Sequence, residues 1–375
     1  MNSTRSEGMQ RLLVLCTLLF CTSLSGCLNT INEAVGDECS FNYKSTDSDT
    51  LRILSYDILA FDSDMIEAFE AEFGYDVEFI YENDAGGILN QMMLTKDTPQ
   101  ADVAIGLDNT YIQTAIDFCL LQPHNLVVEE IQSHLSSQYD SFGVPFDYGH
   151  VCLNLDAGKL LENESAPTSL SDLTNERWAQ AIAIPSPLTS SPGRAFFLAT
   201  LKNFDYDLNK TFDWWTSMKN NQVIVTSGWT EAYEIHYSGG YGVWTEGHIG
   251  DAAITVSYCH SPGVEAFFNY NETMSTSILY NDTSFKQIEY ATMINGAANT
   301  AGAKAFITYL LSYEVNSNMP TSNYMYSVLE NTSLPTEHGY AWHSTKPSSY
   351  SAFDDSMITQ STDELLLHWS EIMMS

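Results

Sequence analysis

The feature that most constrains the fold is a regular alternation of strands and helices in the first third of the chain. The pattern predicts strand, helix, strand, helix and strand, in that order, over residues 51–56, 65–73, 75–81, 88–94 and 101–106. Gly74 follows the first of these helices, at a position where glycine commonly ends a helix. Strands that alternate with helices pair in parallel, and helices then cover the faces of their sheet. This part of the chain therefore predicts an α/β lobe.

The rest of the chain is long enough for a second lobe, because 375 residues exceed what one hydrophobic core usually serves. Further strands are predicted at 149–155, 252–258 and 288–294, and further helices at 301–312 and 363–374. We expect a first lobe over 51–148 and 286–345, a second lobe over 149–285, and a C-terminal helical segment over 346–375. The glycine- and aromatic-containing stretch 239–250 predicts an extended loop.

The N-terminus predicts export from the cytoplasm. An apolar run at 12–21 follows basic residues and precedes Leu24-Ser25-Gly26-Cys27, which is typical of a lipoprotein signal. The run is much shorter than the roughly 20 residues that span a bilayer. We therefore expect a signal peptide over 1–26, a lipid on Cys27, and a polar tether over 27–50. An ordinary signal peptide with a chance cysteine is the alternative. Either way the protein works outside the cytoplasm, in the periplasm or at the cell surface, and the lipid is its only expected contact with the membrane.

Composition excludes some partners. The chain has 48 Asp and Glu residues against 14 Lys and Arg residues, so its formal net charge is −34. Nucleic acid is repelled by such a surface. Small cations are attracted, although an acidic surface also serves solubility. Aromatic residues make up 12% of the chain, which is enough to line a binding cleft as well as to fill cores.

Known catalytic and metal-binding signatures are missing from the sequence. It contains no GxxxxGK[ST], HExxH or GxSxG motif and no clustered His/Cys set, so we expect neither an enzyme nor a cofactor or metal site. Four widely spaced cysteines follow the leader: Cys39, Cys119, Cys152 and Cys259. Their spacing excludes a CxxC motif, and outside the cytoplasm they can form disulfides in three possible connectivities.

Loops at strand and helix ends carry most of the functional signal. Six of them contain aromatic or hydrogen-bonding side chains, at 55–57, 83–87, 189–193, 227–233, 257–262 and 320–326. In α/β lobes, ligands bind outside the carboxyl ends of the strands. We therefore expect loops from two lobes to face each other across a cleft.

Six short runs resemble the thiamine-binding periplasmic proteins, the solute-binding components of thiamine ABC importers. They are GLDN (106–109), VPFDYG (144–149), TSSPG (189–193), GWTEAY (228–233), SYCHSP (257–262) and MPTSNYMY (319–326). The resemblance covers roughly residues 51 to 345, in the order of the family. It implies a two-lobed type II periplasmic binding protein fold, with a ligand cleft between lobes that close about a hinge. It also implies a monomer that captures thiamine, or its phosphates, and delivers it to an ABC permease.

The resemblance assigns candidate ligand-binding residues. Trp229 and Tyr324 would bracket the ring system of thiamine, with Tyr56 and Tyr258 as further walls and Tyr233 in the same set. Thiamine carries a permanently cationic thiazolium ring, which aromatic faces attract. Tyr56 could instead belong to the core. The family has tryptophan where this chain has Tyr324, and the family's tryptophan near 60–63 finds no counterpart here.

Two further positions concern charge. Asp84 matches the family's acidic position and could accept from the aminopyrimidine or balance the cation, or it could only cap the following helix. Ser190 stands at the head of a predicted helix, where free N–H groups could hold an anion such as phosphate. Arg194 departs from the small residue of the family. It could bind phosphate or point to solvent, and we expect solvent.

Other functions stay open at this stage. A ferric-ion binder would place Tyr, His and carboxylate ligands at coordination distance. A polyamine binder would place several separated carboxylates among the aromatic residues. A surface enzyme would need a nucleophile and base that the sequence does not reveal, and a surface interaction domain would not need this set of cleft-type loops.

Overall fold

The computed structural model describes residues 39–41, 48–56, 61, 63–128, 130–237, 249–280, 284–347 and 362–375. The predicted signal peptide, Cys27 and most of the tether lie outside these ranges, as does the greater part of the predicted loop at 239–250. The elements described below belong to one compact unit, 42–375. Among the described residues, no helix has the length and apolar character that crossing a membrane requires.

The predicted alternation near the start of the unit is confirmed. The elements are β1 (Thr50–Tyr56), α2 (Ser63–Phe73), β2 (Asp76–Glu82), α3 (Ala85–Leu94) and β3 (Val103–Asp108). Strand β1 pairs in parallel with both β2 and β3, as expected when helices form the crossovers. Gly74 ends α2 with a φ of 75°, and its N–H donates to the Glu70 carbonyl over 2.9 Å. The local signals therefore predicted the elements and their parallel pairing.

A second group of elements follows in the middle of the chain. It comprises β6 (Ile182–Pro185), α5 (Ser191–Asn203), α6 (Leu208–Asn220), β7 (Ile224–Thr226), a π-helical segment η5 (Glu231–His236), β8 (Ile254–Tyr258), α8 (Ser261–Phe268) and β9 (Ser275–Ile278). Strand β6 pairs in parallel with β7 and β8. Further elements are α4 (Ile112–Asp117), β4 (Leu121–Gln122), α9 (Thr300–Leu310), α10 (Tyr313–Asn316), α11 (Met319–Ser322), β11 (Tyr326–Ser327) and α12 (Tyr340–His343).

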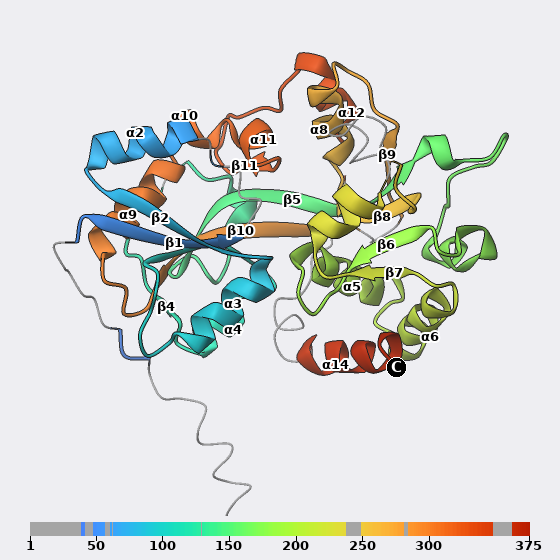
Figure 1. Cartoon of the computed structure of the whole chain (residues 1–375), viewed down its shortest axis with the longest axis horizontal. Coiled ribbons are helices and arrows are strands. Elements are labelled where there is room, and N and C mark those ends of the chain that lie inside the picture. Colours follow the sequence, from blue (N-terminus) through green and yellow to red (C-terminus); the bar gives the residue numbers. More distant parts are fainter. Residues whose placement is uncertain are drawn as a thin grey trace, which may run out of the picture. The chain divides into compact units, whose positions relative to one another are not determined.

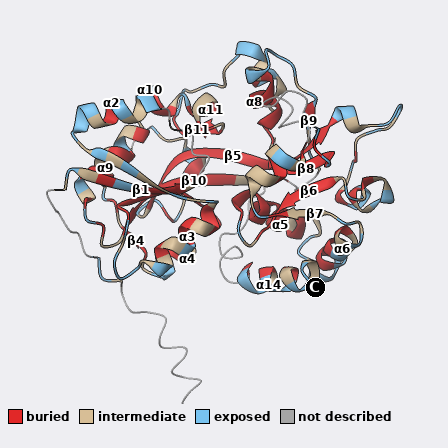
Figure 2. Ribbon diagram, in the orientation of Figure 1, coloured by how far each residue is buried: buried red, intermediate tan, exposed pale blue. Residues whose placement is uncertain are grey.

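Two long strands join the two groups into one sheet. In the described part of the chain, the sheet runs β2-β1-β3-β10-β5-β8-β6-β7. Strands β5 (Gly143–Asp156) and β10 (Phe285–Ile294) are antiparallel neighbours at its middle, and Figure 1 shows them side by side. Figure 2 shows both strands buried along nearly their whole length. The expected lobe boundaries fall within β5 and at the start of β10, and the division of the chain into lobes stays a prediction.

The predicted strand at 149–155 is too short. Strand β5 begins six residues earlier and includes Pro145. Proline lacks the N–H that a ladder needs, so it is tolerated in sheets mainly at irregular positions. Here the pairing with β10 changes register between Glu289 and Tyr290, which leaves Phe146 as an extra residue of β5. Pro145 lies next to this bulge, and the strand continues through it.

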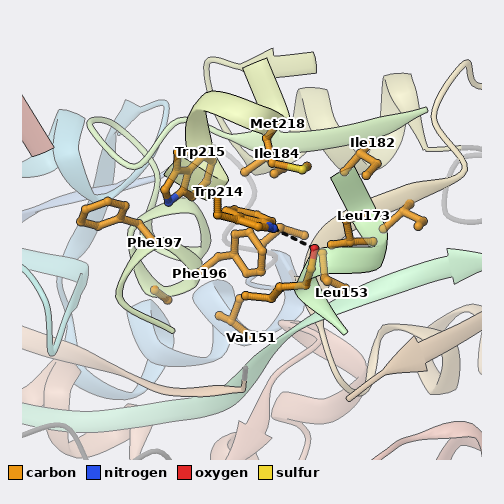
Figure 3. Close-up of a cluster of buried hydrophobic side chains, with 14 of the residues drawn as sticks. Val151, Leu153, Leu173, Ile182, Ile184, Phe196, Phe197, Trp214, Trp215 and Met218 are labelled. Atoms are coloured by element: carbon orange, nitrogen blue, oxygen red, sulfur yellow. Dashed lines mark hydrogen bonds between the residues drawn. The ribbon is translucent and has the colours of Figure 1, made fainter. Parts of the chain in front are cut away.

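The cores lie on the faces of the sheet. Residues of β5, β6, α5 and α6 form one cluster around Trp214 and Trp215, whose members Figure 3 shows packed together. Trp214 Nε1 donates to the Leu170 carbonyl over 2.7 Å. The C-terminal helix α14 (Thr362–Met373) joins this cluster through Trp369, whose ring centroid lies 5.6 Å from that of Trp215. Two further clusters cover the β1–β3 side of the sheet.

One of the possible disulfides is defined by the structure. Cys152 in β5 is bonded to Cys259, which follows β8, and their Cα atoms are 5.0 Å apart. The two strands are antiparallel neighbours, with Val151 opposite Tyr258. The disulfide therefore links residues that the sheet already brings together, across a sequence separation of 107 residues.

Candidate ligand-binding site

A cavity of about 320 Å³ is lined from both groups of elements. Its volume lies in the range of small-molecule sites, about 300 to 1,000 Å³. Six of the seven predicted ligand-binding residues line it: Tyr56, Asp84, Trp229, Tyr233, Tyr258 and Tyr324. They come from loops and strand ends far apart in the sequence. Their contact with a ligand stays a prediction, but the structure brings them to one place.

Trp229 and Tyr233 form a stacked pair in the aromatic wall. Their rings stack with centroids 4.8 Å apart and planes inclined by 17°. Trp229 Nε1 donates to Ser257 Oγ over 2.8 Å, and the Tyr258 ring lies 6.4 Å from the indole. Tyr233 is buried, and its hydroxyl donates to Glu265 over 2.5 Å. These hydrogen bonds fix the orientation of both rings.

The local backbone explains why Trp229 and Tyr233 share one side. They lie where β7 ends and η5 begins, and η5 is a π-helical segment. π-Helical segments are uncommon in proteins, and those that do occur often lie at functional sites. The Glu231 carboxylate accepts from both the N–H and the hydroxyl of Ser227, which secures the start of the segment. The hydrogen bonds from Ser227 lower the pKa of the Glu231 carboxyl.

Tyr56 depends on a bulge in the neighbouring strand. The pairing of β3 with β10 changes register between Tyr290 and Ala291, which leaves Gly106 as an extra residue of β3. Gly106 has a φ of 103°, and a Cβ there would collide with the Tyr56 ring. Glycine is therefore needed both for the backbone conformation and for the space that the ring occupies. The sequence analysis placed Tyr56 either in the wall of the ligand site or in the core. In the structure its ring lines the cavity and also packs against the core.

Asp84 links the two groups of elements. It is the N-cap of α3, and its Oδ1 accepts from the Ala85 N–H over 2.8 Å. The same oxygen accepts from the Ser191 N–H, at the start of α5, over 3.1 Å. Burial raises the pKa of Asp84 to about 6, although the hydrogen bonds from Ser191 and Ala85 oppose the shift. The predicted capping role is thus present, and the carboxylate still lines the cavity.

A pair of buried acids, Asp147 and Glu289, was missed by the sequence analysis. Glu289 lines the cavity and is the neighbour of Asp147 across the β5–β10 ladder. Tyr56 donates to Glu289 Oε2 over 2.8 Å, and Gln287 donates to Glu289 Oε1 over 2.8 Å. Asn323 donates to Asp147 Oδ2 over 2.6 Å. A charged residue within an apolar strand pattern was the signal that could have found both.

The two acids share one environment. Burial raises the pKa of Asp147 to about 8, and it raises the pKa of Glu289 well above its ordinary value, with the charge of Asp147 adding to the effect. A charge on one carboxylate opposes ionisation of the other, so the fully ionised state of the pair is disfavoured. Glu234 also lines the cavity, as Asp84 and Glu289 do. The pKa of Tyr324 is raised mainly by burial and further by the charge of Glu234.

Ser190 and Arg194 lie outside the cavity wall. Ser190 is fully buried at the N-cap of α5, and its neighbour Ser191 lines the cavity instead. The expectation that Arg194 points to solvent is wrong, because it is only 6% exposed. Its guanidinium lies 4.4 Å over the Tyr111 ring and 3.2 Å from Asp363. An aromatic face and a carboxylate make this buried position favourable for the cation.

The described residues contain no set of side chains arranged to bind a metal ion. No group of three or more His, Cys, Asp or Glu side chains there is arranged to hold an ion. His150 and His260 are buried, which lowers the pKa of His150 to about 3 and that of His260 to about 4. The ferric-ion hypothesis therefore gains no support from these residues.

Two α/β lobes joined by paired long strands, with a small-molecule cavity lined from both, define a solute-binding protein. Residues 64–329 match the sequence profile of the bacterial extracellular solute-binding proteins, and the chain belongs to this family.

Known relatives and structures agree with this assignment. The chain is 24% identical over 303 residues to the thiamine-binding periplasmic protein of Escherichia coli, covering 81% of this chain and 86% of the relative. It superposes on the structure of a periplasmic thiamin binding protein with a TM-score of 0.74 and 23% identity, covering 89% and 99% of the two chains. A spermidine/putrescine transporter substrate-binding protein from Streptococcus pneumoniae superposes with a TM-score of 0.58 and 18% identity, covering 86% and 99%. The predicted type II periplasmic binding protein fold is confirmed.

Proposed function

We propose that the protein captures thiamine, or its phosphates, outside the cytoplasm and delivers it to the permease of an ABC importer. One observation carries the proposal: five aromatic and three acidic side chains line one small cavity. The aromatic residues are Tyr56, Trp229, Tyr233, Tyr258 and Tyr324, and the acids are Asp84, Glu234 and Glu289. The names of the relatives in four bacterial genera support the same ligand.

The chemistry of the cavity suits an aromatic cation. The Trp229 indole offers a fixed face, and a desolvated cation–π contact contributes up to about 2 kcal/mol. Asp84 supplies negative charge at the wall, where its interaction with a cation is less screened than in bulk water. Its Oδ2 is also the candidate acceptor for the amino group of the pyrimidine. Tyr324, on the loop after α11, completes the proposed bracket around the ring system.

The remaining expectations belong to this proposal. The protein breaks no bond and needs no cofactor, because carrying a solute requires only binding and release. It acts as a monomer, held at the membrane by a lipid on Cys27 and by no other segment. The family to which the chain belongs works outside the cell's cytoplasm, which supports this placement.

A polyamine is the second candidate. The observation that favours it is that three acidic residues, Asp84, Glu234 and Glu289, line the cavity among aromatic residues. A flexible chain with several ammonium groups could pair with separate carboxylates. Flat stacked rings, such as Trp229 over Tyr233, favour a planar heterocycle instead.

Isothermal titration calorimetry on purified residues 28–375 tests the proposal. We expect thiamine to bind at one site, and Trp229→Ala to weaken binding about 30-fold, because about 2 kcal/mol of cation–π contact is lost. Trp342→Ala is the matched control, since Trp342 is 86% exposed and does not line the cavity. Heat from spermidine or ferric ion without heat from thiamine would contradict the proposal.

A further inference from the structure

We propose that Glu265 is a positioning residue of the ligand site, which raises the affinity for the ligand through Tyr233 without contacting the ligand itself. The inference deepens the proposed function and rests on it, because thiamine is the ligand whose binding tests it. A continuous series of contacts carries the inference from outside the cavity to its wall, in the order Thr273, Glu265, Tyr233 and Trp229.

Glu265 lies in α8 next to a cavity-lining residue and does not line the cavity itself. Its exposed fraction is 0%, whereas Ser261 and Val264 of the same helix belong to the wall. A glutamate is almost never fully buried unless partners compensate for its lost hydration. The hydrogen-bond partners of this side chain therefore indicate what it does.

Each oxygen of the Glu265 carboxyl group has a hydroxyl partner. Tyr233 donates to Oε1 over 2.5 Å, and Thr273 donates to Oε2 over 2.6 Å. Thr273 precedes β9, and its Oγ1 accepts from the Ser275 N–H over 2.9 Å, so the first residue of that strand holds it in place. The carboxyl group thus ties η5, which contains Tyr233, to the start of β9.

The Tyr233 ring in turn supports the indole face of the cavity. The rings of Trp229 and Tyr233 both line the cavity, and their centroids are 4.8 Å apart. Because Tyr233 is held at its hydroxyl by Glu265, its ring cannot tilt away from the indole without breaking a buried hydrogen bond. A ligand that stacks on a wall already in place loses less side-chain entropy from the protein on binding. Glu265 therefore prepares the wall for the ligand.

A purely structural role is the alternative, in which Glu265 contributes to stability only. Burial raises the pKa of Glu265, and hydrogen bonds from Ser275, Thr273 and Tyr233 oppose the shift. Stability alone is a weak reason for such a group, since apolar residues of the same shape can replace a buried hydrogen-bonded pair at little cost. The two roles differ in what they affect: a structural role changes the free energy of unfolding, and a positioning role also changes the affinity of the folded protein.

Calorimetry with thiamine on purified residues 28–375 tests the inference. Glu265→Met keeps the length of the side chain but removes both hydrogen bonds, so it should weaken binding about fivefold, because the ligand must then order the wall. Glu265→Gln offers an oxygen to Tyr233 and an N–H to Thr273 Oγ1. It should therefore restore binding to within about twofold of the unaltered protein.

Tyr237→Phe is the matched control. Tyr237 follows η5, is fully buried and donates to Ser275 Oγ over 2.9 Å, but it does not line the cavity. The substitution removes a buried tyrosine hydroxyl from the same part of the chain and should leave the affinity unaltered within about twofold. Urea denaturation gives the free energy of unfolding of each variant, so that affinities are compared among folded proteins.

Tyr233→Phe shows whether Glu265 acts through Tyr233. This variant keeps the ring and removes the hydroxyl, so binding should again weaken about fivefold. Adding Glu265→Met to Tyr233→Phe should then change the affinity by no more than about twofold, since the contact between the two side chains is already lost. If Glu265→Met fails to fold, the comparison of Tyr233→Phe with Tyr237→Phe decides the same question.

The outcomes separate the two proposals. Thiamine binding that Glu265→Met, or Tyr233→Phe, affects no more than Tyr237→Phe does would overturn the positioning role and leave the proposed function standing. A loss in Glu265→Gln as large as that in Glu265→Met would also overturn it, because the hydrogen bonds would then not be the cause. Losses that multiply in the double variant would overturn the action through Tyr233. No binding of thiamine to the unaltered protein would overturn both proposals.

Discussion

At the scale of single residues, Asp84 combines a structural and an electrostatic role. Its Oδ1 accepts from Ala85 in its own helix and from Ser191 at the start of α5. Burial raises its pKa to about 6, which is within reach of ordinary pH changes. The carboxylate is therefore charged at neutral pH and partly protonated in mild acid.

The affinity for a permanent cation should depend on this titration. A bound cation favours the charged carboxylate, so binding lowers the pKa of Asp84 and expels its proton below about pH 6. Affinity should therefore rise from pH 5 to pH 7 and level off above, by up to about tenfold for each pH unit below the pKa. Calorimetry across this range measures it. Asp84→Asn should flatten the curve, and an unchanged slope in that variant would assign the dependence to another group.

At the scale of elements, the first turn of α3 packs closely against the loop that precedes α5. A Cβ on Gly86 would lie 2.8 Å from the Thr189 carbonyl oxygen, which is backbone and cannot rotate away. A Cβ on the neighbouring Gly87 would lie 3.1 Å from the Glu82 side chain, within the same βα unit. The two glycines thus face different partners although they are adjacent in sequence.

Gly86→Ala should impair binding more than folding. Overpacking costs about 1 to 3 kcal/mol, and here the contact that it opposes joins the two sides of the cavity. We expect thiamine affinity to fall about fivefold or more. Gly87→Ala is the matched control and should change affinity little. Equal losses in both variants, measured by calorimetry together with thermal unfolding, would show that the effect lies in the helix and not between the lobes.

At the scale of the whole molecule, one sheet continues through both lobes. Strands β5 and β10 are paired from Gly143 to Val151, and this pairing makes Asp147 and Glu289 neighbours beside the bulge, with Glu289 on the cavity wall. The C-terminal helix α14 packs on α6 and joins the core around Trp214 and Trp215, and Figure 1 shows it near the β6–β7 end of the sheet. Residues of α14 thus contribute to this core, and none of them lines the cavity.

Removing the Trp369 ring should separate stability from binding. Trp369 is fully buried and packs edge to face on Trp215 at 5.6 Å, so Trp369→Ala should lower the free energy of unfolding by about 3 to 5 kcal/mol. Leu367→Ala on the same helix, where the side chain is 62% exposed, should change it by about 0.5 kcal/mol or less. Urea denaturation measures both. A large loss of thiamine affinity in folded Trp369→Ala protein would contradict this division of roles.

The sequence by itself determined the elements and most of the cavity's aromatic residues. The alternation at 51–106, the end of α2 at Gly74, the position of Trp229 in a loop and that of Tyr258 at a strand end were all predicted. These features depend on periodicity and on residues close together in the chain, so a short window of sequence contains them. The order of loops also indicated the family to which the chain belongs.

Only the tertiary structure determined which charged side chains lie next to each other. Asp147 and Glu289 are 142 positions apart and become neighbours through strand pairing with a bulge, which local patterns do not encode. Arg194 is buried because Tyr111 and Asp363, both distant in sequence, surround it. The bond between Cys152 and Cys259 likewise follows from the pairing of β5 with β8. In each case the physical reason is the same: burying a charge or closing a long loop is favourable only when distant partners are already in place.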